Sequence, residues 1–183
     1  MPRLNDQPKR NNMPNNYTVN VTVTVTTWPG NNGDITAYSI AIKDSDTPAG
    51  FLSCDTTGHF TASMAYKPRP VPPATTPPSN ITIGGPVSPG DQIVFKFGGS
   101  TVGSTVYTVT DIGGLNGLVG GLAWGQKSTA NGATSITATV TAAPVTAGTT
   151  HAKYSVVMQR TIAGSPPTVE TATIDPDFET DVT

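Results

Sequence analysis

Between Tyr17 and Trp28 the chain reads YTVNVTVTVTTW, in which apolar and uncharged polar residues alternate strictly as far as Thr26. Successive side chains of a β-strand point to opposite faces, so a period of two residues indicates a strand. One face of this strand carries Tyr17, Val19, Val21, Val23 and Val25. The other face carries threonine and asparagine. The segment therefore predicts a strand that buries its valines against a second layer and presents an uncharged polar face.

Similar alternation recurs along the chain, and the stretches between are rich in residues that favour turns. It predicts further strands at 59–66, 91–97, 104–112, 134–142, 151–162 and 168–174, and we expect 104–112 to pair with 91–97. No ten-residue helical pattern is found. These features predict an all-β protein, a single antiparallel β-sandwich of about 8–10 strands with immunoglobulin-like or jelly-roll connectivity.

The 183 residues suffice for one domain with short extensions. We predict an extended polar arm at 1–15, the β-sandwich domain at 16–174 and an acidic C-terminal tail at 175–183. Inside the domain, the proline-rich segment 67–79 is expected to cross between sheets, because proline cannot donate a hydrogen bond to a neighbouring strand.

The composition narrows the choice of partners. Charged residues are only 12% of the chain, whereas threonine occurs 31 times. A net charge of −2 gives no general attraction for nucleic acid, and no apolar run reaches the roughly 18 residues needed to span a bilayer. The N-terminus lacks the apolar core of a secretory signal, so we expect a cytoplasmic protein, or an extracellular one if a leader has been removed.

The segment CDTTGHFTASM combines Cys54, His59 and Met64 at five-residue spacing, and blue-copper sites use one thiolate, two imidazoles and a thioether. This spacing resembles the ligand loop of cupredoxins, and the resemblance implies a copper site completed by His151. The chain departs from the family pattern, since no histidine precedes Cys54 and the loop lies in the first third. Met64 also falls on the same alternating face as Phe60, which favours packing in the core.

No catalytic pattern emerges. The chain has two histidines and no nucleophile elbow of the form GxSxG, so a Ser-His-Asp triad is not indicated. The acidic residues gather in turns and in the tail, without the spacing of a calcium-binding EF-hand loop. The glycine-rich stretches lack the lysine of a phosphate-binding loop. We therefore expect no enzymatic activity and no cofactor.

Two features point to self-assembly instead. The flat threonine face of 16–28 carries no charge that would oppose pairing with another chain. The glycine-rich segment 113–125 holds large apolar side chains that would form an exposed patch unless they are covered; these are Leu115, Leu118, Leu122 and Trp124. We predict a self-assembling structural subunit of a filament, shell or inclusion, with strand or arm exchange between copies.

A glycan-binding module is the alternative. Sandwich domains that bind carbohydrate use exposed aromatic rings beside polar loops, and Trp28, Tyr107 and Trp124 are the candidates here. The sequence does not show whether these three rings lie together.

Overall fold

The computed structural model describes residues 14–68, 81–84, 87–130, 133–141 and 148–182. Within these ranges the chain forms sixteen β-strands and no helix, which confirms the prediction of an all-β protein. Accordingly, the described part of the chain offers no helix of the length and hydrophobicity required to cross a membrane.

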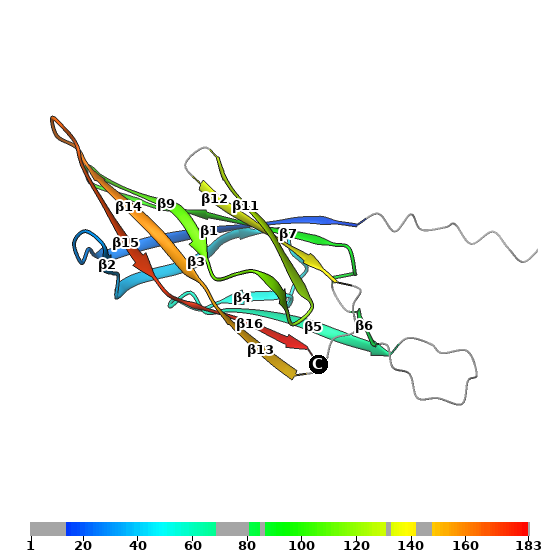
Figure 1. The fold of residues 1–183 in the computed structure, drawn as a ribbon. Helices are drawn as coiled ribbons and strands as arrows, with labels where there is room; N and C mark the ends of the chain where they lie inside the picture. The colour runs from blue at the N-terminus through cyan, green and yellow to red at the C-terminus, as the bar shows by residue number, and fades with distance from the viewer. Residues whose placement is uncertain (1–13, 69–80, 85–86, 131–132, 142–147, 183) are drawn as a thin grey trace, which may run out of the picture.

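Six strands form the largest sheet, sheet A. In spatial order they are β10 (Gly117–Val119), β11 (Leu122–Ala130), β12 (Ala133–Val140), β7 (Gln92–Gly98), β1 (Asn16–Thr27) and β3 (Ala37–Ser45). Of these, β11, β12, β7, β1 and β3 are labelled in Figure 1. Strand β1 lies inside the sheet, parallel to β7 and antiparallel to β3.

The other strands form two smaller sheets. Sheet B has the order β2 (Gly33–Asp34), β15 (Thr168–Ile174), β14 (Ser155–Ile162), β9 (Thr105–Gly113) and β8 (Thr101–Val102). Sheet C has the order β13 (Gly148–Lys153), β16 (Asp177–Val182), β5 (Phe60–Pro68) and β4 (Leu52–Cys54), and β6 (Ile81–Gly84) pairs with β5.

This topology corrects the prediction of a single antiparallel sandwich. Three strand pairs are parallel, namely β1 with β7, β16 with β5, and β15 with β2. Parallel pairing joins strands that are distant in the sequence, and hydrophobic alternation contains no information about which strands those are. The strand count exceeds the prediction because several strands have only two to four residues, too few to show a period.

A long broken hairpin connects sheets B and C. Strands β13 and β14 are separated only by Tyr154, and β15 and β16 only by Asp175 and Pro176. The Tyr154 amide donates a 3.0 Å hydrogen bond to the Pro176 carbonyl, so both breaks lie at the same level. Beyond this level each arm of the hairpin pairs with different neighbours, which carries the chain from one sheet to the next (Figure 1).

Aromatic side chains fill the space between sheets A and C. The ring of Phe60 on β5 contacts Phe95 and Phe97 of β7 at 5.9 and 6.2 Å between centroids, and Phe178 of β16 at 5.9 Å. Each of these side chains is at most 2% exposed. A fully buried side chain of this size contributes about 1.5–3 kcal/mol, so this layer is a major source of stability.

The C-terminal segment differs from the expected acidic tail at 175–183. Residues 177–182 form β16, which lies between β13 and β5. Phe178, Thr180 and Val182 alternate with the acidic residues and are at most 2% exposed. The negative charges therefore lie on the outer face of a strand whose other face is in the core. The many acidic residues favoured the prediction of a tail, although apolar and acidic residues alternate here.

The strand predicted at 104–112 does not pair with 91–97. Strand β7 belongs to sheet A and β9 to sheet B, and the chain changes sheet after Gly98. The change requires a close backbone approach at Gly99, where a Cβ atom would lie 2.0 Å from the Tyr107 carbonyl oxygen. Most of the predicted arm at 1–15 and of the crossing segment at 67–79 lies outside the described residues.

Candidate functional site

The four predicted copper ligands do not converge. Cys54 pairs with Phe60 in the register of β4 and β5, so its side chain shares the inner face of sheet C. Met64 is also on that face and has no exposed surface. His59 and His151 instead lie beside Glu179 on the outer face. In the described part of the chain, no three His, Cys, Asp or Glu side chains are arranged to hold a metal ion.

The surroundings of Cys54 favour the protonated thiol. Burial, followed by the negative charge of Asp55, raises the pKa of Cys54 to about 12. The loop that gave the motif its spacing is a turn built on Asp55, whose carboxylate accepts hydrogen bonds from the amides of Thr57 and His59 at 2.8 and 3.0 Å. The resemblance to cupredoxins therefore reflects a turn rather than a ligand loop.

Both histidines of the chain share one carboxylate. Nε2 of His59 lies 3.5 Å and Nδ1 of His151 lies 3.4 Å from the same oxygen, Oε2 of Glu179. The register accounts for this arrangement, because Glu179 pairs with His151 on one side and with Thr61 on the other. Sequence reasoning missed the grouping because it placed Glu179 in a tail.

Most of the predicted assembly residues are in the core. Val19, Val21, Val23 and Val25 are at most 4% exposed, and both edges of β1 are already paired. Strand 16–28 is therefore unavailable for exchange in this fold.

The glycine-rich segment 113–125 folds over its own core in the same way. Gly120 and Gly121 have φ of 50° and 91°, which closes a tight hairpin between β10 and β11. Leu115, Leu122 and Trp124 are then at most 8% exposed. Tyr17 is partly buried, and Leu118 remains 56% exposed.

Exposed apolar side chains gather elsewhere, at one end of sheet B. We define the distal end of sheet B as residues 101–108 and 159–171, together with Trp28. Of the four large hydrophobic residues exposed in the described chain, three lie here: Val102 (56%), Val106 (43%) and Val169 (50%). The hairpin of β14 and β15 projects at this end in Figure 1.

The strand register aligns two of these valines on one face. Val169 pairs with Thr161, Thr161 with Val106, and Val106 with Thr101, so four uncharged side chains form a row across β15, β14, β9 and β8. Directly opposite residues point to the same side of a sheet. The next row is Thr171, Gln159 and Thr108, which is also uncharged.

The opposite face of the distal end holds a small polar and aromatic cluster. The Trp28 and Tyr107 rings lie 5.9 Å apart, and the Arg160 guanidinium lies 5.1 Å from the centre of the Trp28 ring. Arg160 also forms an ion pair with Glu170. Two of the three predicted glycan-binding rings thus lie together, with Arg160 packed on Trp28, while Trp124 is in the core.

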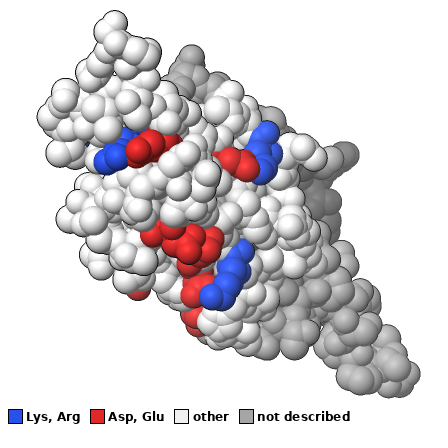
Figure 2. Space-filling model, turned by 60° about the vertical axis from the view of Figure 1, so that its left-hand side comes forward, with Lys and Arg blue, Asp and Glu red and all other residues white. Residues whose placement is uncertain are grey.

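Charge is sparse over the surface. In the face shown in Figure 2, lysine and arginine side chains lie next to acidic ones, and these small groups are separated by wide uncharged areas. The ion pairs between Lys127 and Asp111 (2.6 Å) and between Lys153 and Asp177 (3.9 Å) are of this kind.

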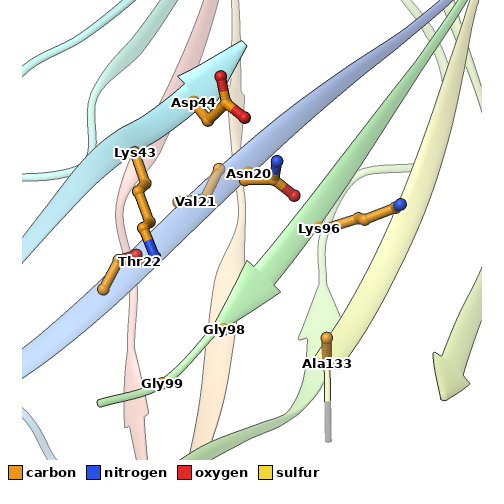
Figure 3. A pocket seen from close by; sticks show the side chains of 9 residues that line it. All are labelled: Asn20, Val21, Thr22, Lys43, Asp44, Lys96, Gly98, Gly99 and Ala133. Atoms are coloured by element: carbon orange, nitrogen blue, oxygen red, sulfur yellow. The ribbon is translucent and has the colours of Figure 1, made fainter. Parts of the chain in front are cut away.

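A hollow of about 400 Å³ lies on the outer face of sheet A. Its lining comes from β1, β3, β7 and β12, with Gly99 just after β7 (Figure 3): Asn20, Val21, Thr22, Lys43, Asp44, Lys96, Gly98, Gly99 and Ala133. Gly98 explains the hollow, since it pairs with Thr22 on β1 at a position where every other residue type would place a side chain.

A register shift brings the charged residues to the hollow. Asn20 pairs with Asp44 and Val21 with Ile42, so Lys43 is an extra residue in β3. Such a bulge redirects side chains. In Figure 3, Lys43 extends across β1 toward Thr22, and Lys96 lies on the other side of Asn20.

No family model matches the chain, and no curated protein matches it. Among solved structures, it is similar to an inclusion body protein (PixA) from Burkholderia cenocepacia J2315, with a TM-score of 0.49 and 6% identity. The superposition covers 95% of this chain and 99% of that one.

Proposed function

We propose that this is a non-enzymatic structural protein whose copies associate through the distal end of sheet B. The observation that carries the proposal is the pair of exposed valines Val106 and Val169, which lie in one uncharged row across β9, β14 and β15 at the end where the β14–β15 hairpin projects. Exposed apolar groups that cluster in this way mark interaction surfaces.

A second copy is the occupant that the surface chemistry favours. In a symmetric dimer the same patch meets itself, so any net charge in the patch would repel its own copy. The two central rows contain only valine, threonine and glutamine. On the opposite face, the charges of Arg160 and Glu170 compensate each other. The patch is therefore electrostatically neutral toward itself.

The location differs from that expected from the sequence, where residues 16–28 and 113–125 supplied the contacts. Leu118 is the one large exposed hydrophobic residue of that earlier set, and it lies on β10 in sheet A. It provides a matched control, because its exposed fraction of 56% resembles those of the distal valines.

Size-exclusion chromatography with light scattering tests the proposal. We expect the double variant V106K/V169K to be smaller than the wild type, because paired lysines would bring like charges together in the contact. The variant L118K should keep the wild-type size. Loss of association in L118K alone would move the contact to β10, and an unchanged size of V106K/V169K would contradict the proposal.

A further inference from the structure

The hollow on the outer face of sheet A has unused hydrogen-bonding capacity. Neither Lys43 nor Lys96 forms an ion pair with a described acidic residue, in contrast to Lys127 and Lys153. The side chains of Asn20, which lies between the lysines in Figure 3, and of Thr22, which lies beside the end of Lys43, also make no hydrogen bond within the described chain. The hollow therefore presents ammonium, amide and hydroxyl donors that have no hydrogen-bond acceptor within the described chain.

Its charge balance differs from that of the whole protein. Two ammonium groups and the single carboxylate of Asp44 leave one net positive charge at the hollow, whereas the chain carries −2. Hydrogen bonds between an ammonium and an anionic oxygen are roughly twice as strong as neutral ones. The hollow thus favours an anionic group over a neutral one.

The remaining groups suit hydroxyls. The Asp44 carboxylate can only accept hydrogen bonds, the Asn20 amide can donate and accept, and the Thr22 hydroxyl can do both. A ligand that uses all three must itself carry several hydroxyl groups. The volume of about 400 Å³ falls in the range of small-molecule sites, about 300–1,000 Å³.

We propose that this hollow binds a saccharide unit that carries a phosphate or carboxylate group. Figure 3 shows the two lysine side chains pointing away from each other on either side of Asn20, so both must turn toward the anionic group when it binds, while Asp44, Asn20 and Thr22 bind the hydroxyls. No aromatic ring lines the hollow, so charge-assisted hydrogen bonds rather than ring stacking supply the affinity. The site is on sheet A and shares no residue with the distal end of sheet B. The binding proposal is therefore tested independently of the self-association proposed above.

A titration of the ¹⁵N-labelled full chain, followed by amide chemical shifts, tests the site with four probes: D-glucose 6-phosphate, D-glucuronate, D-glucose and inorganic phosphate. We expect the two anionic sugars to shift the amides of Asn20, Thr22 and Lys96, and to bind more weakly at higher salt concentration. Lys43→Gln and Lys96→Gln should each weaken binding at least about tenfold, as expected for loss of a charged hydrogen-bond donor.

Gly98→Val adds a branched side chain at the hollow, where the new Cβ atom would have its nearest contact at 3.9 Å, with the Val21 carbonyl oxygen. This variant should abolish binding while its spectrum stays folded. Lys153→Gln, on the exposed strand β13, should bind like the wild type. Absence of saturable shifts, equal binding of D-glucose, or equal binding of inorganic phosphate would each overturn the assignment, as would undiminished binding by Gly98→Val.

Discussion

The Tyr154 hydroxyl donates a 2.7 Å hydrogen bond to the carbonyl oxygen of Gly58, a residue 96 positions earlier. Tyr154 lies where the long hairpin passes from sheet C to sheet B, and its ring contacts Phe60 and Phe97. Burial raises the pKa of this phenol well above its ordinary value, so the hydroxyl remains a donor throughout the accessible pH range. One side chain thus fixes the hairpin to the turn before β5.

Tyr154→Phe should lower the free energy of unfolding by about 1–2 kcal/mol, because it removes a buried hydrogen bond and leaves the Gly58 carbonyl unpaired. Urea denaturation followed by tryptophan fluorescence measures this loss. Tyr38→Phe is the matched control, since its hydroxyl donates to Thr57 in a more exposed setting. Equal effects of the two substitutions would show that Tyr154 has no special role at the junction.

Two adjacent glycines should respond differently to alanine. A Cβ at Gly99 would lie 2.0 Å from the Tyr107 carbonyl oxygen, so Gly99→Ala must displace backbone where the chain changes sheet, at a cost of about 1–3 kcal/mol. A Cβ at Gly98 would have its nearest neighbour, the Val21 carbonyl oxygen, at 3.9 Å. Gly98→Ala should therefore change the free energy of unfolding by no more than about 0.5 kcal/mol. Thermal unfolding of both variants checks this; a larger loss for Gly98→Ala would contradict the described crossing.

Cys54 should be a poorly reactive thiol. Its pKa is raised to about 12, so very little thiolate is present at pH 8. Because the thiolate is the nucleophile, the native protein should react far more slowly with a disulfide reagent at pH 8 than the urea-unfolded chain does. Similar rates in the two states would show that the thiol is neither buried nor protonated as described.

The same thiol predicts a dependence of stability on pH. Above an unfolded-state pKa near 9.0 the unfolded chain loses the proton while the folded chain keeps it, so the stability contributed by this group is complete below pH 9 and declines as pH rises toward 12. Between pH 8 and pH 10, the free energy of unfolding should therefore decrease more for the wild type than for Cys54→Ala. Parallel behaviour of the two proteins would contradict the shifted pKa.

Local structure was largely predictable from the sequence. Alternation located β1, β7 and β12, and for β1 it identified the buried face, because the period of two directly reflects side-chain direction. The glycine-rich segment 113–125 was recognised as unusual, but its burial was not foreseen. Whether Leu122 meets solvent or another sheet depends on packing that a single segment does not encode.

Sheet membership and the surface sites were not predictable. The distal end of sheet B depends on register between β9, β14 and β15, which aligns Val106 with Val169 across more than 60 residues of sequence. The hollow on sheet A requires the parallel pairing of β1 with β7 and a bulge at Lys43. Neither leaves a local sequence signal, since Val106, Val169 and Lys43 are each unremarkable in their own segments.

Sedimentation velocity of the wild-type protein over a concentration series tests the central claim of self-association most directly. We predict that the sedimentation coefficient rises with concentration, from an 18.8 kDa monomer toward dimers or larger species. A single 18.8 kDa species at every concentration would contradict the proposal that the exposed valines of sheet B join copies of this chain.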